Sequence, residues 1–486
     1  MNDARAGPAE GAGAGSTLAA ASDRWPLRGL SVDVGGEGST SRYARTLLAA
    51  LGARTGERDG PRDEHPALAW ARCGLMALTG ARDGAPQMLA APIAACADGV
   101  LQALAALGAR LPPAFASGAA MLGERAALLG LQRHGAISAG GSCRLLSTGD
   151  DGMLAVNLPR PDDWDALPAW LGGHAVSDRP DWDGLARALR ECGTEDLVER
   201  DRLLGLAVAA AAMPPASAPG WCRLQRVAAR RDRRARTPLV VDLSSLWAGP
   251  LCGQLLRQLG ARVIKVESRN RPDGARRGSP AFFDRMNAGK ACVALDFGSA
   301  HDVAALRRLL ARADIVIESA RPRALRQLGI DAQQLLAEQP GLTWIGISGY
   351  GRAQPAANWI AFGDDAGVAG GLSSLLAATS GRWAFCGDAI ADPLAGLHAA
   401  LAAWSGFVGG GGLLIDLSLQ QVAAHCAAWE RPAGADALAE RWHAWTGLAW
   451  RAGLAERRPA PPPAGERARA LGADTWAVLD EQALPC

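Results

Sequence analysis

The sequence lacks several features that would point to particular classes of protein. No hydrophobic run approaches the length of about 18 residues that a membrane-spanning helix needs. The 51 basic and 49 acidic residues nearly balance, so the net charge of +2 provides no basic field for nucleic acid. We therefore expect neither a membrane nor nucleic acid as a partner.

Metal-binding and disulfide patterns are also missing. The ten cysteines are scattered without a CxxC pair or a Cys/His cluster, and the seven histidines include no HxxxH pair. We expect no metal site and no disulfide framework. The first 24 residues lack the apolar segment of a secretory signal and are rich in Ala and Gly. This pattern predicts a flexible tail and a cytoplasmic protein.

What the sequence does contain is the composition of a globular protein. Hydrophobic residues make up 49% and charged residues 21% of its 486 residues, enough for about three domain-sized units. Lysine is nearly absent: only Lys265 and Lys290 occur, and the other 49 cations are arginine. Because this bias favours arginine everywhere, an arginine run is weak evidence of function, whereas the two lysines are candidates for a specific role.

Breaker-rich and charged stretches divide the chain. A proline-rich stretch at 213–219 and an arginine run at 230–236 separate two halves, and a proline run begins at Pro459. The predicted units are a flexible tail (1–24), a degenerate half (25–212), a linker (213–236), a second domain (237–430) and a C-terminal segment (431–486).

The second half has the strongest secondary-structure pattern. Short runs rich in β-branched residues at 239–243, 262–267, 315–318 and 344–348 alternate with helical stretches at 251–259 and 304–313. This alternation predicts an open α/β sheet of parallel strands. In such sheets, ligands bind at the carboxyl ends of the strands.

Parts of the first half repeat the pattern of the second. Residues 27–54 parallel 238–262, residues 74–80 parallel 371–381, and residues 92–104 parallel 389–401. The first copy lacks the stretch that 263–358 covers in the second. The sequence therefore predicts a partial internal duplication with an abbreviated first copy.

Three motifs of the second half occur together in a known family. They are LVVDLSSLWAGPLCGQLLRQLGARVIKVES, FFDRMNAGKACVALDF and ADIVIESARPRALRQLGIDAQQLLAEQPGLTWIGISGYG. In this order they resemble the family III CoA-transferases (the carnitine-dehydratase/formyl-CoA-transferase type) from about Val240 to Leu419. The stretch 141–161 resembles a later strand pair of the family, and the C-terminal RARALGADTWAVL resembles its ending.

This resemblance implies a fold and a chemistry. The family fold is a Rossmann-like α/β domain with an open parallel sheet, plus a smaller second domain. Its enzymes move CoA from an acyl-CoA thioester to a carboxylic acid through an aspartyl anhydride and an aspartyl-CoA thioester. Acyl-CoA and a small carboxylic acid are the implied partners, with CoA as substrate and no permanently bound cofactor.

The family also suggests how the two halves are arranged. Its subunits pair like interlinked rings, and the active site forms where two subunits meet. Segments 27–150 and 237–420 are therefore expected to pack on each other as a monomeric pseudo-dimer, with a homodimer as the alternative.

The expected nucleophile of the family is an aspartate upstream of a Gly-Leu pair. Aligned on Gly371-Leu372, this chain has Gly363 at that position, followed by Asp364 and Asp365. A one-residue shift in the preceding turn would let Asp364 act as the nucleophile. Alternatively, the two carboxylates cap a helix that begins nearby. The candidate catalytic residues are Asp364, which is favoured, and Asp365.

The resemblance also implies contacts to CoA. Backbone N–H groups in the loop before the first helix can meet phosphates or the thioester oxygen, and this loop contains Trp247, Ala248 and Gly249. Cations expected at the same end of the sheet are Lys265, Arg269 and Lys290. After the third strand, the family's Glu-Asn-Phe-Arg-Pro reads ESARP here, which supplies Ser319 and Arg321 but no aromatic wall.

Two other functions compete with CoA transfer. Acyl-CoA racemases share the fold and use a His/Asp pair for proton transfer. Asp388 matches their aspartate, but Phe362 occupies the histidine position. A catalytically impaired paralogue that binds acyl-CoA would also explain the shifted aspartate and the altered adenine motif.

Overall fold

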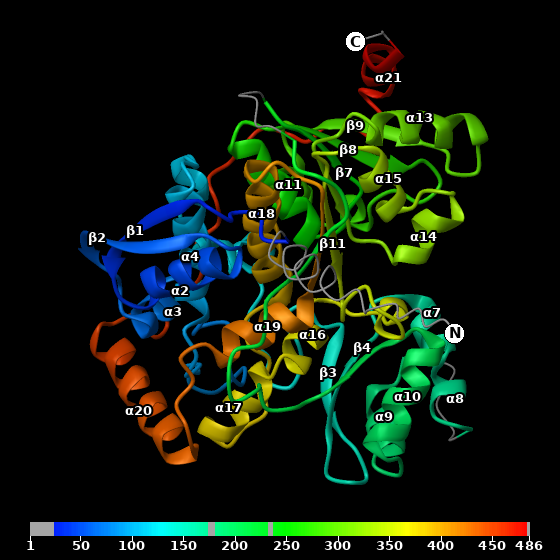
Figure 1. Ribbon diagram of the computed structural model, residues 1–486. Helices are drawn as coiled ribbons and strands as arrows, with labels where there is room; N and C mark the ends of the chain where they lie inside the picture. Colours follow the sequence, from blue (N-terminus) through cyan, green and yellow to red (C-terminus); the bar gives the residue numbers. More distant parts are fainter. Residues whose placement is uncertain (1–23, 174–179, 232–236, 484–486) are drawn as a thin grey trace, which may run out of the picture.

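The chain folds around one large twisted sheet with helices on both sides and a second strand–helix unit to the left of it in Figure 1. The computed structural model describes residues 24–173, 180–231 and 237–483. Apart from Arg24, the predicted flexible tail lies outside the described residues. None of the helices in these ranges is long and apolar enough to span a membrane.

The large sheet contains seven strands among the described residues. In spatial order they are β6 (Arg223–Arg226), β12 (Leu413–Ser418), β11 (Thr343–Ser348), β10 (Ile315–Glu318), β7 (Leu239–Asp242), β8 (Arg262–Ser268) and β9 (Ala291–Leu295). All neighbours are parallel except β6, which is antiparallel to β12. Counted from β7, the parallel strands lie in the order 3-2-1-4-5-6. Sheets with this order bind ligands where the order reverses, which here is between β7 and β10.

Helices cover both faces of this sheet. One face carries α11 (Ala248–Gln258) and α18 (Ala391–Val408), and the other carries α13 (Ala300–Leu310), α14 (Pro322–Gln327) and α15 (Ala332–Glu338). Successive side chains of a strand point to opposite faces. Val240 accordingly lies in the hydrophobic core beneath α11, and Val241 lies in the core on the side of α13 and α15. Burial on both faces explains why these strands are continuously apolar.

The N-terminal segment forms a smaller strand–helix unit. Strands β1 (Ser31–Glu37) and β2 (Arg54–Arg62) are parallel and are joined by α2 (Ser39–Ala50). Helix α4 (Ile93–Ala106) contacts both α2 and α18. One hydrophobic core contains Leu47 of this unit together with Leu397 of α18. The expectation that segments 27–150 and 237–420 make extensive mutual contact is therefore met.

A second, antiparallel sheet lies below the large one in Figure 1. Its strands are β3 (Cys143–Ser147), β4 (Met153–Asn157) and β5 (Ala207–Ala210), in that order. The helices around it are α7 (Pro161–Asp165), α8 (Leu167–Trp170), α9 (Trp182–Leu189) and α10 (Thr194–Leu204). The strand pair expected within 141–161 is present as β3 and β4.

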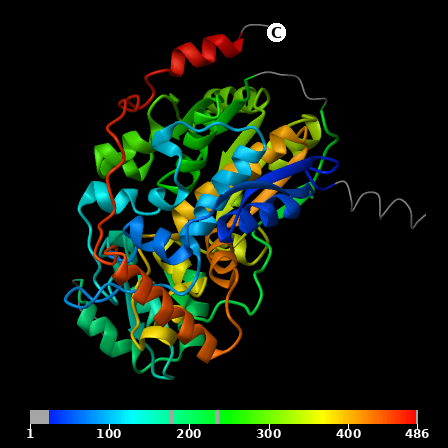
Figure 2. The same cartoon turned by 90° about the vertical axis from the view of Figure 1, so that its left-hand side faces the viewer.

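The remaining helices lie between these units or at the periphery of the molecule (Figure 1). They are α3 (Pro66–Arg72), α5 (Gly118–Met121), α6 (Glu124–Leu129), α12 (Pro280–Asn287), α16 (Gly363–Ala369), α17 (Leu372–Ser380), α19 (Leu419–Ala428), α20 (Ala435–Arg451) and α21 (Thr475–Ala483). After α20, an extended segment runs along one side of the molecule to α21, which contacts β9 (Figure 2). The stretch predicted as a linker also supplies the edge strand β6.

Candidate functional site

The two candidate carboxylates lie at the start of α16 and face different surroundings. Asp365 accepts hydrogen bonds from the backbone N–H of Phe362, at 3.0 and 3.2 Å, and from the Asn157 side chain at 2.8 Å. It is fully buried, and burial raises its pKa to about 8. Asp365 therefore caps the helix and joins it to β4, as one of the two sequence-based alternatives proposes.

Asp364 points instead toward a group of buried charges. Its Oδ1 accepts a hydrogen bond of 2.9 Å from the backbone N–H of Ala389, and the residue is 8% exposed. Burial and the nearby charge of Asp388 raise the pKa of Asp364 to about 6, although Arg125 acts in the opposite direction. Its carboxyl group is therefore mainly ionised at pH 7, as a nucleophile must be.

An arginine from the N-terminal segment organises this group of charges. Arg125, on α6, donates to both oxygens of the fully buried Asp388, at 2.8 and 2.5 Å. Its guanidinium also lies 5.3 Å from the ring centre of Trp247. A third carboxylate, Asp392, has its pKa raised to about 7 by burial. Arg125 thus connects the carboxylates around Asp364 with the loop predicted to meet CoA.

Gly363 occupies the position that the alignment gives to the family nucleophile. A Cβ added there would lie 2.2 Å from the backbone oxygen of Ala389 and 2.5 Å from Oδ2 of Asp392. These separations are shorter than van der Waals contact, so the local packing requires glycine. An aspartate at this position could not be accommodated in the described conformation, which leaves Asp364 as the neighbouring carboxylate.

The cavity beside Asp364 is small. Its volume is about 10 Å³, room for about one water molecule. It is lined by Gly363, Asp364, Gly367, Val368, Leu372, Ser373, Phe385, Cys386 and Ile390. In the described conformation the carboxylate is therefore enclosed, with no space for an acyl chain.

The predicted loop before α11 lies where the strand order reverses. Trp247 is buried and packs edge-to-face on Phe282, with ring centres 5.2 Å apart. Ala248 and Gly249 form the first turn of α11, so their N–H groups belong to the unpaired start of a helix. A Cβ on Gly249 would lie 2.2 Å from the Ser244 side chain, so close packing here requires glycine.

The two lysines are not exposed at this edge, contrary to the expectation. Lys265 is 1% exposed and donates to the backbone oxygen of Ser244 and to Asp273, both at 2.9 Å. Lys290 is 2% exposed and donates to Asp242 and to the backbone oxygen of Pro250, both at 2.8 Å. The structure offers neither ammonium to a phosphate. Both instead hold the loop between β7 and α11 from within.

Arginines occupy the carboxyl edge where lysines were expected. Arg269 follows β8 with a side chain 59% exposed, 3.8 Å from Asp302. Ser319 accepts a hydrogen bond of 3.2 Å from the backbone N–H of Ser245. Arg321 precedes α14, and burial together with the charges of three other arginines lowers its pKa; these are Arg323, Arg160 and Arg271. No sequence pattern singled out Arg323, Arg160 or Arg271, because arginine is common throughout the chain.

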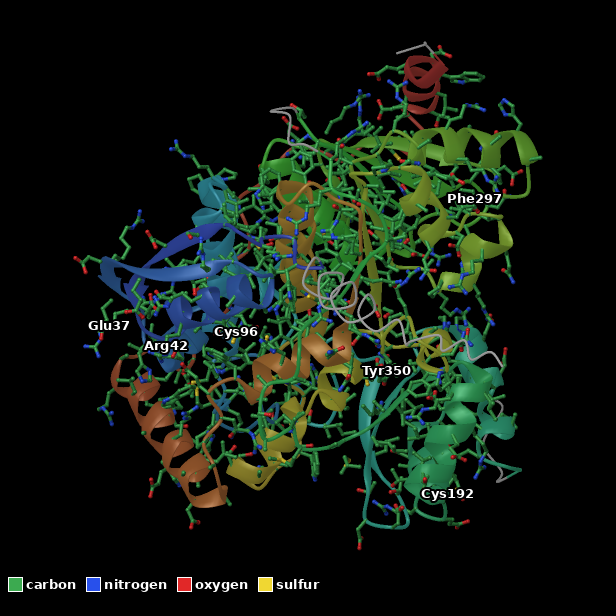
Figure 3. All side chains as sticks on the ribbon, in the orientation of Figure 1. Glu37, Arg42, Cys96, Cys192, Phe297 and Tyr350 are labelled. Atoms are coloured by element: carbon green, nitrogen blue, oxygen red, sulfur yellow. The ribbon has the colours of Figure 1, made fainter. Side chains whose placement is uncertain are left out.

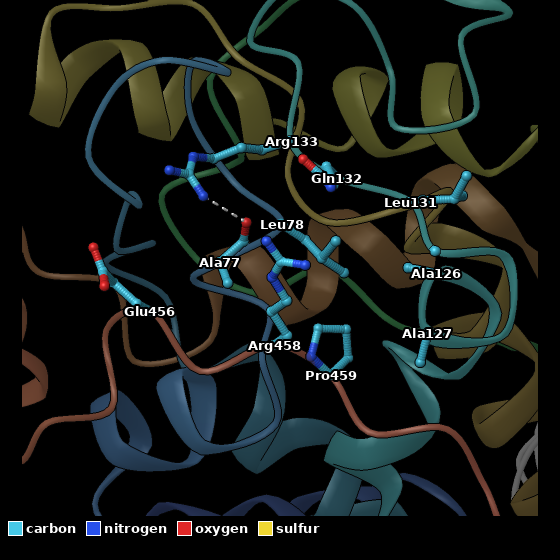
Figure 4. Close-up of a pocket in the computed structure, with 11 residues that line it drawn as sticks. Ala77, Leu78, Ala126, Ala127, Leu131, Gln132, Arg133, Glu456, Arg458 and Pro459 are labelled. Carbon is cyan, nitrogen blue, oxygen red and sulfur yellow. Dashed lines mark hydrogen bonds between the residues drawn. The ribbon is translucent and has the colours of Figure 1, made fainter.

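Two further features surround the site without containing a predicted residue. Tyr350, labelled in Figure 3, is half-buried, and its pKa is raised well above the usual value by burial of its hydroxyl and by the charges of Asp365 and Asp201. A pocket of about 480 Å³ lies between residues 126–133 and the extended segment around Pro459 (Figure 4). In its wall, Arg133 donates to the backbone oxygen of Ala77 at 3.2 Å.

The described residues contain no group of three or more His, Cys, Asp or Glu that could hold a metal.

Comparison with known proteins identifies the sheet domain. Residues 238–445 match the model of CoA-transferase family III. The chain is 32% identical over 171 residues to succinyl-CoA–D-citramalate CoA-transferase from Chloroflexus aurantiacus, which covers 34% of this chain and 42% of that protein. It is 34% identical over 114 residues to α-methylacyl-CoA racemase from Homo sapiens, which covers 24% and 28%.

A solved structure of a CAIB/BAIF family protein from Brucella suis is also similar. The likeness covers 50% of this chain and 98% of that chain, with 22% identity and a TM-score of 0.40. The chain spans less than half the length of the two curated relatives named above. The segment 238–445 therefore resembles CoA-transferase family III, whose model it matches.

Proposed function

We propose that the chain is a CoA-transferase that moves CoA from an acyl-CoA thioester to a small carboxylic acid. The observation that carries the proposal is the buried carboxylate of Asp364, which lies among the charges of Asp388 and Arg125 in a segment that matches the family III model. The Rossmann-like strand order supports binding of CoA between β7 and β10, beside the start of α11. Arg269, Ser319 and Arg321 lie along the same edge and supply cations and hydrogen-bond donors for its phosphates.

The proposed reaction has four successive acyl-transfer steps, all involving the Asp364 carboxylate. Asp364 attacks the thioester carbonyl and expels the CoA thiolate, which leaves a mixed anhydride. The thiolate then attacks the aspartyl carbonyl and releases the donor acid, which leaves an aspartyl-CoA thioester. The acceptor carboxylate attacks that thioester and expels the CoA thiolate, which leaves a second mixed anhydride. The thiolate then attacks the acceptor's acyl carbonyl, which forms the new acyl-CoA and releases the Asp364 carboxylate. Because the cavity beside Asp364 is small, turnover requires this region to open.

Covalent labelling tests the assignment. Borohydride added during turnover reduces an aspartyl thioester to an alcohol, and mass spectrometry is expected to find this change at Asp364. Asp364→Asn is expected to lose activity by at least a thousandfold, whereas the matched variant Asp365→Asn keeps most of it. A label at Asp365 or Asp388 would contradict the assignment. A fully active Asp364→Asn without any label would exclude the covalent mechanism.

The pH dependence provides an independent test. Only the ionised form of Asp364 is a nucleophile, and its pKa is raised to about 6. Below that pH the carboxyl is protonated, so kcat/KM is expected to rise with pH and to level off above about 7. A rate that does not change between pH 5 and pH 8 would contradict the role of Asp364 as nucleophile.

A second candidate is an acyl-CoA-binding protein without transferase activity. The glycine at the family position and the enclosed cavity favour it. It predicts CoA binding by calorimetry, no exchange of labelled CoA between acids, and no effect of Asp364→Asn. Racemisation is disfavoured because Phe362 supplies no imidazole and Asp388 is bound to Arg125.

We also propose that the two strand–helix units are copies that form a pseudo-dimer within one chain. Strand β1 pairs with β2 in the register that β7 makes with β8, beginning at Ser31 with Arg54 and at Leu239 with Arg262. Light scattering is expected to give the mass of one chain. A stable dimer would contradict a monomeric pseudo-dimer.

A further inference from the structure

A row of charged side chains crosses the sheet face that α15 covers. The strands place four residues in direct register across this face: Glu318 on β10, Gly346 on β11, Asp416 on β12 and Arg223 on β6. Register partners in neighbouring strands point to the same side of a sheet. The row therefore brings acidic and basic groups together at the edge formed by β12 and β6.

Arg352 fills the gap above Gly346 in this row. A Cβ on Gly346 would lie 2.6 Å from Cδ of Arg352, so glycine leaves the space that the arginine side chain occupies. The guanidinium pairs with Glu318, and the backbone N–H of Arg352 donates to Oδ2 of Asp416 at 3.0 Å. Glu318 is thus neutralised, and one oxygen of Asp416 is used.

The other polar atoms at the end of the row are unused. Oδ1 of Asp416 is buried and has no hydrogen-bond partner among the described residues. Arg223 lies beside it in register and is exposed, and its side chain makes no hydrogen bond or close ion pair with any residue that the structure describes, although its charge acts on Asp416. Buried acceptors are rarely left unpaired in native structures, so this one points to a ligand.

A pocket of about 390 Å³ lies at this place. Its walls come from β6, β12, the residues after β11 and the junction of α14 with α15; the charged and amide groups are Arg223, Gln225, Arg326, Asp331, Gln333, Arg352 and Asp416. Arg326 is 60% exposed and lies 3.3 Å from Asp331. Arg352 is paired with Glu318 and Arg326 lies near Asp331, so Arg223 is the cation of this wall that is available to an anion. None of the residues assigned to CoA transfer lines the pocket.

We propose that this pocket binds a small α-hydroxycarboxylate. The carboxylate of the ligand pairs with Arg223, and its hydroxyl donates to Oδ1 of Asp416. An acid without the hydroxyl would leave Oδ1 unpaired and would lie near its negative charge. This second small-molecule site goes beyond CoA transfer and does not depend on it, because a catalytically inactive chain would keep the same pocket.

Binding of 2-hydroxybutyrate and butyrate to the full chain tests the proposal. Titration calorimetry is expected to show 2-hydroxybutyrate binding at least tenfold more tightly than butyrate. In Asp416→Asn, the amide oxygen must accept from Arg352, so its N–H₂ group faces the ligand. This variant is expected to lose the preference for the hydroxy acid, while Arg223→Gln weakens both acids at least tenfold. Arg82→Gln, an exposed arginine in the N-terminal unit, is the matched control.

Several outcomes would overturn the inference. Equal affinity for the two acids in the unchanged protein would refute recognition of the hydroxyl. Unchanged affinity in Arg223→Gln would show that the acids bind elsewhere. If neither acid binds at millimolar concentration, the pocket is not a site for small carboxylic acids. Asp416→Asn is uninformative if its thermal transition shows that it does not fold. In that case, Arg223→Gln tests the binding site, and the comparison of the two acids in the unchanged protein tests recognition of the hydroxyl. None of these binding measurements requires transferase or proton-exchange activity. A negative result for this pocket would therefore leave the proposed CoA-transferase function unaffected.

Discussion

The two strand–helix units share a register but differ in what they bury. Both begin with a parallel pair joined by a helix, and both second strands start at an arginine, Arg54 in β2 and Arg262 in β8. Following the register, Val34 in β1 corresponds to Asp242 in β7. Val34 lies in an apolar core, whereas Asp242 lies between Lys290 and Lys265.

This difference indicates what the buried charges are for. An apolar group of similar size is usually at least as stabilising as a buried ion pair, so such a pair is weak evidence of a purely stabilising role. In the second unit, the lysines bind the backbone oxygens of Ser244 and Pro250, on either side of Trp247. The first unit has the apolar Val34 at the position that corresponds to Asp242, and therefore no ion pair there. We infer that the pairs fix the loop where CoA is proposed to bind.

Among the variants that test this comparison, removal of a buried lysine is expected to lower the free energy of unfolding most. Lys290→Met leaves Asp242 buried beside one cation instead of two, and breaking a buried ion pair costs about 3–5 kcal/mol. Urea denaturation measures the loss in the free energy of unfolding. Arg82→Met, which changes an exposed cation of the first unit, is the control and is expected to be nearly neutral.

A second variant distinguishes charge from packing. Asp242→Leu combined with Lys290→Met removes both partners and is expected to recover part of the stability. A single variant that loses less than about 1 kcal/mol would contradict the assignment of Lys290 as a buried, paired cation. Lost CoA affinity with unchanged stability would instead restore the sequence-based expectation of a phosphate contact.

The next largest effect is expected at Arg125, and it tests whether this residue of the N-terminal segment supports the carboxylates around Asp364. Arg125→Ala leaves Asp388 buried without its two hydrogen bonds, and such a bond to a charged group contributes about 1.5–3 kcal/mol. Chemical denaturation is expected to show a loss of that size. Because Arg125 also opposes the raised pKa of Asp364, the pH at which activity rises is expected to move upward in this variant. An unchanged pH profile would separate Arg125 from the site.

The fold was largely predictable from local pattern. Apolar runs at 239–243, 315–318 and 344–348 correspond to β7, β10 and β11 because strands buried on both faces must be continuously apolar. Strand β6 was missed because an edge strand does not need a continuous apolar run. Its sequence, Arg-Leu-Gln-Arg, contains one apolar residue among charged and polar ones. The position of β6 in the sheet depends on its pairing with β12, which is far away in the sequence and therefore could not be predicted from local pattern.

The site was predictable only in part. The pair Asp364-Asp365 was found from its position before Gly371-Leu372, and the capping role of Asp365 follows from helix chemistry. Arg125 was not found, because it lies 263 residues from its partner Asp388. The lysines were expected in loops at the carboxyl edge of the sheet, whereas Lys265 lies within β8 and Lys290 directly precedes β9, and both are buried against carboxylates. The sequence does not show which carboxylate a buried lysine faces.

The smallest effect concerns the contact that joins the helices of the two units. Tyr43 on α2 forms a hydrogen bond of 2.8 Å to Nε2 of His398 on α18, and both residues are fully buried. Nδ1 of His398 lies 2.7 Å from the backbone oxygen of Leu394, which requires a proton on Nδ1 and leaves Nε2 as the acceptor. Tyr43→Phe keeps the ring packing and removes only the hydroxyl donor.

The expected loss is about 0.5–1.5 kcal/mol, the usual net contribution of one hydrogen bond. Thermal and urea unfolding of Tyr43→Phe measure it, with Thr46→Ala as the control on the exposed side of the same helix, where the hydroxyl bonds only to the backbone of its own turn. A loss above 3 kcal/mol would show that the hydroxyl organises more than this contact. No loss at all would show that the two units adhere through apolar packing alone, because Leu47 and Leu397 still share one core.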